Sequence, residues 1–164
     1  MIKVLVISDT HGDLKNFDRL VKLTGMPDVL IHCGDFEGTE GYFESEVPCK
    51  KLMVRGNCDI ICDLEPVVKE SLNNLDIMVT HGHRYSVYYG LDTLFETARE
   101  NRCKVIFYGH THVPSVKYDE ETGIWAVNPG SLSRPRQVGG KPSYILMEVE
   151  DDGTPHFMLN YLDL

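Results

Sequence analysis

Five short apolar runs in this sequence are each followed at once by a turn that carries Asp, Asn or His side chains. The runs are rich in Val, Ile and Leu, which is typical of buried strands. We expect the ends of five strands in one sheet to bring these side chains to a common rim, where open α/β sheets hold their sites. The turns are, in chain order, Asp9-Thr10-His11, Gly34-Asp35, Gly56-Asn57-Cys58-Asp59, His81-Gly82-His83 and Gly109-His110-Thr111-His112.

The order of apolar patterns predicts an α/β fold in a single domain over residues 1–164. We expect two mixed β-sheets packed face to face and flanked by helices. The first two thirds alternate strand and helix, and the last third is rich in strands joined by Gly-containing turns. The expected helices are 14–23 and 91–98, and the expected strands are 2–7, 29–31, 52–54, 77–79, 105–107, 115–118, 125–127, 144–149 and 157–161.

Charge and composition exclude several classes of partner. The net charge is −9 and no run of basic residues is present, so binding to nucleic acid or to an anionic membrane surface is disfavoured. No apolar run approaches the roughly 18 residues of a membrane span, and the first residues do not resemble a secretory leader. The five cysteines form no CxxC pair, which indicates reduced thiols. We therefore expect a cytoplasmic protein.

Each of the five turns is a weak signal when it is taken alone. An Asp-x-His or Gly-Asp at a loop is more often a turn or capping residue than a metal ligand. Paired histidines such as His110 and His112 are stronger, because neutral imidazole is the commonest metal ligand. The joint occurrence of all five turns, each one after a predicted strand, is what favours a metal site.

Taken together, the five turns resemble the ordered motifs of the calcineurin-like metallophosphoesterases. The short chain, the Gly56-Asn57-Cys58-Asp59 variant and Asn128-Pro129-Gly130-Ser131 make the sequence most similar to the small single-domain branch of YfcE-like phosphodiesterases. The resemblance runs from Ile2 to about Glu150. It implies the metallophosphoesterase-like α/β sandwich and a metal-dependent phosphoesterase, most similar to a phosphodiesterase that acts on a small organic phosphodiester.

The resemblance also implies a pair of divalent metal ions. Asp9, His11 and His112 would bind one ion, Asn57, His81 and His110 the other, and Asp35 would bridge them. A carboxylate suits that role because its two oxygens can hold two cations. The mixed imidazole, carboxylate and amide set favours Mn first, with Fe, Zn, Ni or Co as alternatives. Two such ions would make the site locally positive despite the charge of the whole chain.

The expected reaction is attack on phosphorus by a hydroxide that bridges the two ions. Besides Asp35 and Asn57, His83 is a candidate catalytic group, since many members of the family carry His where this chain has Cys58. A thiol cannot replace an imidazolium as an acid. Cys58 is therefore either a small filler or a weak donor beside Asn57, and His83 is either the substitute acid or a structural residue.

Contacts to a small phosphorylated substrate are predicted for Asn57, Cys58, Arg134 and Arg136. The two arginines could donate hydrogen bonds to phosphate oxygens in a bidentate contact, or they could be a solvated surface pair. Three alternatives stay open on activity: a phosphomonoesterase, a nucleotide phosphatase, or a non-catalytic scaffold, since the same fold serves as a retromer subunit. Exposed aromatic residues would also allow a homo-oligomer.

Overall fold

A computed structural model describes residues 1–163 of the chain, and within them it contains two five-stranded sheets. The first sheet has the order β10-β9-β1-β2-β3, with β1 parallel to β2 and antiparallel to β9. The sheet is therefore mixed. Its strands are β1 (Ile2–Ile7), β2 (Val29–His32), β3 (Lys50–Met53), β9 (Ser143–Val149) and β10 (Pro155–Tyr161).

The second sheet is also mixed and has the order β4-β5-β6-β8-β7. Its central strands β5, β6 and β8 are parallel, and both edges are antiparallel. Its strands are β4 (Val67–Leu72), β5 (Leu75–Thr80), β6 (Val105–Phe107), β7 (Ser115–Asp119) and β8 (Ile124–Asn128). The helices are α1 (Lys15–Thr24), α2 (Glu40–Glu46) and α3 (Asp92–Glu100).

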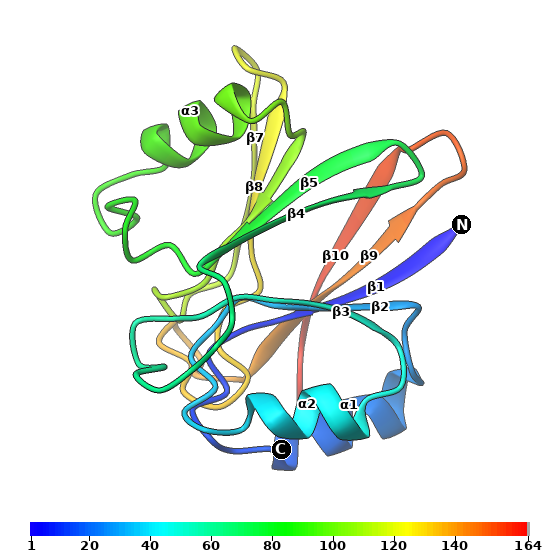
Figure 1. The fold of residues 1–164 in the computed structure, drawn as a ribbon, viewed down its shortest axis with the longest axis vertical. Helices are drawn as coiled ribbons and strands as arrows, with labels where there is room; N and C mark the ends of the chain where they lie inside the picture. The colour runs from blue at the N-terminus through cyan, green and yellow to red at the C-terminus, as the bar shows by residue number, and fades with distance from the viewer. Residues whose placement is uncertain (164) are drawn as a thin grey trace.

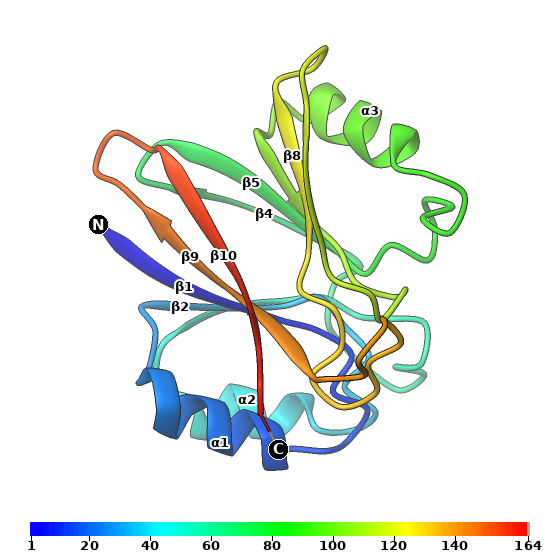
Figure 2. The same cartoon turned by 180° about the vertical axis from the view of Figure 1, so that it is seen from behind.

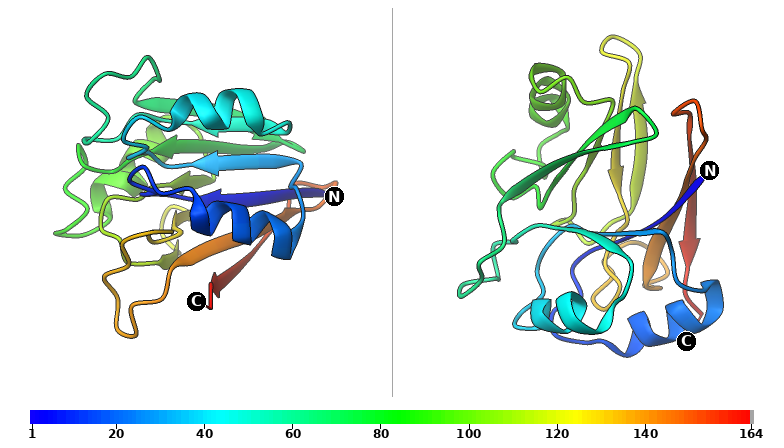
Figure 3. Two further views of the ribbon diagram at one scale, coloured as in Figure 1. Left: turned by 90° about the horizontal axis from the view of Figure 1, so that it is seen from below. Right: turned by 45° about the vertical axis from the view of Figure 1, so that its right-hand side comes forward.

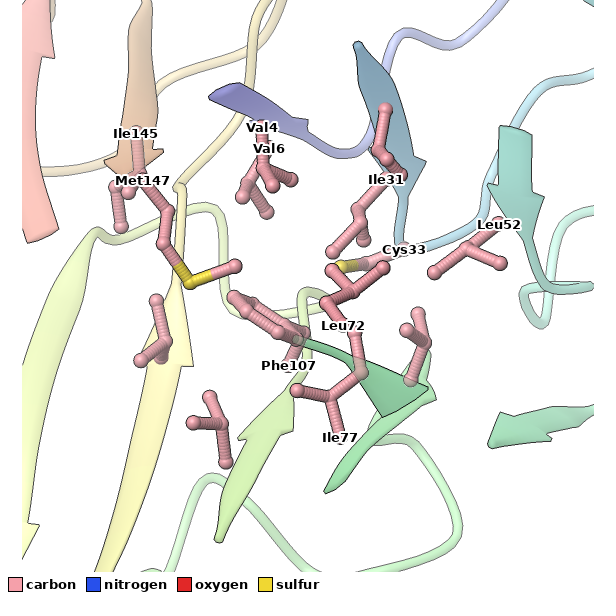
Figure 4. Close-up of a cluster of buried hydrophobic side chains, with 14 of the residues drawn as sticks. Val4, Val6, Ile31, Cys33, Leu52, Leu72, Ile77, Phe107, Ile145 and Met147 are labelled. Atoms are coloured by element: carbon pink, nitrogen blue, oxygen red, sulfur yellow. The ribbon is translucent and has the colours of Figure 1, made fainter. Parts of the chain in front are cut away.

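The sheets pack face to face and the helices lie outside them (Figures 1 and 2). Helices α1 and α2 cover the outer face of the first sheet, and α3 covers the outer face of the second. The largest core cluster lies between the sheets, where Val6 and Ile31 of the first meet Ile77 and Phe107 of the second (Figure 4). Because Phe107 is fully buried, its truncation to Ala would cost about 3 to 5 kcal/mol.

The expected α/β sandwich with two packed mixed sheets is confirmed, and the expected helices and strands are present within one to three residues at their ends. Two elements were not predicted. Strand β4 is an edge strand whose Lys69 and Glu70 interrupt the apolar pattern. Helix α2 buries only Phe43, so it shows too little periodicity to be recognised from sequence. Among the described residues, no helix is long and apolar enough to cross a membrane.

Candidate metal centre

The predicted ligand turns meet at one edge of the molecule, but they come from two sheets. Strands β1, β2 and β3 of the first sheet and β5 and β6 of the second all end there (Figure 3). The expectation that the five strand ends belong to one sheet is therefore wrong. A hydrogen bond connects the two sheets at this edge. The N–H of His110, which follows β6, donates to Oδ2 of Asp9, which follows β1, at 3.1 Å. Two packed sheets can surround a site from both sides, which one sheet cannot do.

One group of polar atoms converges on a single point beside β1. The Nε2 atoms of His11 and His112 are 3.0 Å apart. Asp9 Oδ1 lies 3.2 Å from His112 Nε2 and 3.7 Å from His11 Nε2. The Asp9 and His112 side chains are buried.

The other ring nitrogen of each of these histidines determines which tautomer it adopts. His11 Nδ1 lies 2.7 Å from Glu37 Oε1, and His112 Nδ1 lies 2.7 Å from the Arg134 carbonyl oxygen. Both partners are acceptors, so both Nδ1 atoms carry the proton and donate. Each neutral Nε2 atom then presents a lone pair toward Asp9 Oδ1. Three electron-pair donors that face one another at such distances fit a cation between them.

A second group of atoms forms around Asp35. Its Oδ2 atom is 3.3 Å from His81 Nε2, while its Oδ1 atom accepts the Cys58 N–H at 2.8 Å. His81 Nδ1 donates to the Cys33 carbonyl oxygen at 2.7 Å, which again directs the Nε2 lone pair into the site. Both His81 Nε2 and Asp9 Oδ1 are buried without a hydrogen-bond partner. A buried polar atom of this kind is costly, and a divalent cation would satisfy both.

The remaining predicted ligands lie at the outer side of Asp35. Asn57 Oδ1 and His110 Nδ1 are 3.0 Å apart, and the His110 ring centroid is 5.1 Å from that of His81. Asn57 is exposed, whereas His81 is fully buried. The structure therefore brings all seven predicted metal ligands together, with a buried inner part and an exposed outer part.

The charges of this cluster are strongly coupled. Burial opposes ionisation of Asp9, but His11 and His112, which can donate to its carboxylate when their Nε2 atoms are protonated in the metal-free protein, lower the pKa of Asp9 well below the usual range. Burial likewise opposes ionisation of Asp35, yet the neighbouring His81 lowers the pKa overall. Burial alone would lower the pKa of His81, whereas Asp35 and Asp9 raise it. Protons and divalent cations therefore compete for the same imidazole nitrogens.

The backbone at the site is held in an uncommon conformation. Five of the predicted ligands have a positive φ angle although none is glycine, namely Asp9, His11, Asp35, His110 and His112. Such residues cost energy and cluster at functional sites. Gly56 and Gly109 supply the close approach, because a Cβ atom on either would overlap the Asp35 or Asp9 carboxylate.

Two acidic residues support the ligands without facing the convergence point. Glu37 orients His11 through the bond to Nδ1, as outer carboxylates do at metal sites. The sequence analysis missed Glu37, and its place two residues after Asp35 is the only signal. Asp59 was not predicted as a ligand and is not placed as one. Its carboxylate accepts four backbone N–H groups, those of Asp35, Phe36, Glu37 and Gly56.

The predicted catalytic and substrate contacts lie around the rim. The His83 ring centroid is 5.4 Å from that of His81, and the buried Nδ1 atom of His83 has no hydrogen-bond partner. Cys58 lies beside Asn57, and burial raises the pKa of its thiol to about 11. The thiol therefore stays protonated. Arg134 and Arg136 are exposed, and their backbone is bonded to His112.

Comparison with known proteins agrees with this geometry. The family model of the calcineurin-like phosphoesterase superfamily domain matches residues 2–152. The phosphodiesterase YfcE of Escherichia coli is 32% identical, with 87% of this chain and 85% of that protein covered. A predicted phosphoesterase from Streptococcus pneumoniae has a solved structure with a TM-score of 0.79 and 25% identity, covering 97% of this chain and 98% of that one.

A solved structure of Vps29 from Entamoeba histolytica, complexed with zinc, shares the fold. Its TM-score is 0.77 at 24% identity, and 98% of this chain and 99% of that chain are covered. The fold is therefore found both in proteins described as phosphoesterases and in a protein named for vacuolar sorting.

Proposed function

Because this chain belongs to the calcineurin-like phosphoesterase superfamily, we propose that it is a metal-dependent phosphodiesterase acting on a small organic phosphodiester. The observation that carries the proposal is the convergence of Asp9 Oδ1 and the Nε2 atoms of His11 and His112, while both Nδ1 atoms are bonded to acceptors outside the cluster. The name of the Escherichia coli relative, phosphodiesterase YfcE, supports the diester preference.

The proposed site holds two divalent cations. Asp9, His11 and His112 would bind one, and Asn57, His81 and His110 would bind the other. Asp35 would contact both, because its Oδ2 atom lies 3.3 Å from His81 Nε2 and 3.8 Å from His11 Nε2. Mn²⁺ is the first choice of ion for this mixed ligand set, and Fe, Zn, Ni or Co are the alternatives.

The proposed reaction is hydrolysis of one ester bond of a phosphodiester. The oxygen of water bonds to phosphorus, the bond from phosphorus to one ester oxygen breaks, and the water proton ends on the departing alcohol. The second product is a phosphate monoester. Two bound divalent cations lower the pKa of water and neutralise phosphoryl oxygens in such reactions.

This chain's own residues would orient the reactants. Asn57 lies on the exposed side of the cluster, where a phosphoryl group would enter. His83 is the proposed proton donor to the departing alcohol, because its ring centroid lies 5.4 Å from that of His81 and 6.1 Å from that of His110. Burial and the neighbouring His81 lower the pKa of His83, so that only a minor fraction of it is protonated at neutral pH. Cys58 cannot take that role, since its protonated thiol is a weak acid. Esters with good leaving groups should therefore be the better substrates.

The decisive experiment compares metal-free and Mn²⁺-loaded protein on bis(p-nitrophenyl) phosphate and on p-nitrophenyl phosphate. We expect turnover only with metal, and faster turnover of the diester. Asp35→Ala should lose both metal occupancy and hydrolysis, with activity at least about a thousandfold lower. Asp151→Ala is the matched control, because this exposed aspartate lies in the turn between β9 and β10.

Each alternative gives a different result in the same experiment. A phosphomonoesterase or nucleotide phosphatase would prefer the monoester, and a scaffold would hydrolyse neither compound with Mn, Fe, Zn, Ni or Co. Full activity of Asp35→Ala would overturn the assignment of Asp35 as the shared ligand. The cytoplasmic location and the homo-oligomer remain predictions, and the five cysteines are free among the described residues.

A further inference from the structure

The loop that carries Arg136 is hydrogen-bonded to His112, which is one of the proposed metal ligands. The Arg136 N–H donates to the His112 carbonyl oxygen at 3.0 Å, and His112 Nδ1 donates to the Arg134 carbonyl oxygen at 2.7 Å. Two hydrogen bonds of opposite direction therefore hold this segment against His112. The exposed side chains of Arg134 and Arg136 therefore extend from a backbone that is fixed beside His112.

The Arg136 side chain is directed toward the outer half of the site. Its Nη1 atom donates to Tyr88 Oη at 3.1 Å, and the Tyr88 hydroxyl donates to the His110 carbonyl oxygen at 3.2 Å. The Tyr88 ring also meets the His110 ring at a centroid distance of 5.1 Å. Tyr88 thus links the Arg136 guanidinium to the backbone of His110, whose ring nitrogen Nδ1 is 3.0 Å from Asn57 Oδ1.

The guanidinium of Arg136 is a cation without an acidic partner. Within residues 1–163 no carboxylate oxygen lies within 4.0 Å of it, whereas Arg134 Nη1 is 3.8 Å from Glu37 Oε1. Most arginines in residues 1–163 likewise have no carboxylate partner, and Arg136 differs from them because its guanidinium is bonded to Tyr88 beside His110. An unpaired, partly oriented guanidinium at the mouth of a phosphate site is suited to bind an oxyanion.

We propose that Arg136, supported by Tyr88, binds a second phosphate group of the substrate. The inference rests on the proposed function and deepens it, since the substrate class becomes a phosphodiester that also carries a phosphate monoester. The phosphate to be cleaved would lie at the cluster of Asp35 and Asn57, whereas Arg136 is held through Tyr88 at the backbone carbonyl of His110 and contacts neither of these residues. A monoester carries nearly two negative charges at neutral pH, so it gains most from this guanidinium.

Two synthetic esters with the same leaving group test this inference. One is thymidine 5′-(p-nitrophenyl phosphate), and the other is the same compound with a phosphate on the 3′ oxygen. We expect the Mn²⁺-loaded protein to have a KM about tenfold lower for the 3′-phosphorylated ester. Arg136→Gln should remove this preference, and Tyr88→Phe should reduce it about threefold, because the guanidinium loses its support.

Arg102→Gln is the matched control. It removes the same charge from an exposed position between α3 and β6, at the end of β6 that is remote from the site, and the preference should be unchanged. If Arg136→Gln raises KM for both esters equally, Arg136 binds the scissile phosphate and the inference is wrong. Equal KM values for the two esters in the wild type would also overturn it.

Binding without turnover separates this inference from the proposed function. Calorimetry on the Mn²⁺-loaded protein should give tighter binding of thymidine 3′,5′-bisphosphate than of thymidine 5′-phosphate, by about tenfold, and Arg136→Gln should abolish the difference. If neither ester is hydrolysed but the bisphosphate is preferred, the proposed function fails while the Arg136 site stands. Equal binding of the two nucleotides overturns the Arg136 site alone.

Discussion

The inner and outer halves of the candidate metal centre are built differently. In the inner half, Asp9 and His112 are buried, and His11 and His112 each have one ring nitrogen bonded to an acceptor. In the outer half, His81 is likewise buried and bonded to an acceptor, but Asn57 is exposed on a loop and His110 is only partly buried. The inner half is therefore already arranged to receive a cation, whereas the outer half has more freedom.

This difference predicts that the two halves would bind their cations with different affinities. Preorganised ligands lose little conformational entropy when they bind, so the inner cation should be held more tightly. The outer ligands are the ones that a substrate meets first, since Asn57 and Cys58 lie at the rim. The comparison predicts one tight and one weaker metal site.

The largest expected effect comes from removing one ligand from each half. His112→Ala should weaken binding of the tighter ion by more than about a hundredfold, because even outer partners of a ligand contribute tenfold to a hundredfold. Asn57→Ala should weaken only the second ion, by about tenfold. Competition with a chromophoric chelator measures both affinities. His156→Ala is the control, because this exposed histidine pairs with Glu150. Equal losses in the two variants would remove the distinction between the halves.

The next effect concerns the carboxylate that joins the Asp35 and Asn57 loops. In Asp59, Oδ1 accepts the N–H groups of Phe36 and Glu37, and Oδ2 accepts those of Asp35 and Gly56. Asp59→Asn would direct an NH₂ group at two donors in either orientation, so we expect a loss of about 3 kcal/mol in the free energy of unfolding. Urea denaturation of the metal-free protein measures it.

A matched variant for this experiment is Asp28→Asn. Asp28 also accepts a backbone N–H, that of Lys3, but at an exposed position, so its loss should stay below about 1 kcal/mol. Asp59→Asn should also weaken the outer metal site more than the inner one. If Asp59→Asn loses no more free energy of unfolding than Asp28→Asn, Asp59 does not hold the two loops together.

The smallest expected effect is a pH dependence of the free energy of unfolding that is caused by His32, whose ring bonds to Thr10 beside the inner half. His32 is buried, its Nδ1 atom accepts the Gly34 N–H, and its Nε2 atom bonds to Thr10 Oγ1. Burial lowers the pKa of His32 to about 3, so the folded state keeps it neutral. The unfolded chain takes up a proton below about pH 6.5. Stability is therefore complete above that pH and falls as the pH decreases toward 3.

Between pH 6.5 and pH 5 this single group should remove about 2 kcal/mol of stability from the metal-free protein. His32→Asn keeps an acceptor for the Gly34 N–H but does not titrate there. The difference in unfolding free energy between wild type and variant, measured at both pH values, isolates the contribution of His32. If the two proteins show the same pH dependence, the buried histidine is not kept neutral by the fold.

Much of the candidate site could be read from the sequence because its ligands follow recognisable strands. Asp9, Asp35 and His81 each come directly after an apolar run, and a buried strand leaves its last residues at the edge of a sheet. Strand β4 was missed because Lys69 and Glu70 interrupt its apolar pattern. Helix α2 was missed because Phe43 is its single buried residue. These elements depend on packing more than on their own pattern.

The chain itself determined which side chains are available: the order of Asp, Asn and His turns and the apolar strands before them specify the ligand types and the family. The three-dimensional arrangement alone decided that these turns approach one another from two sheets. It also decided that Glu37 orients His11, and that Arg136 meets Tyr88 across 48 residues. The reason is that local patterns report burial along one element, whereas contacts between distant segments depend on how two sheets pack against each other.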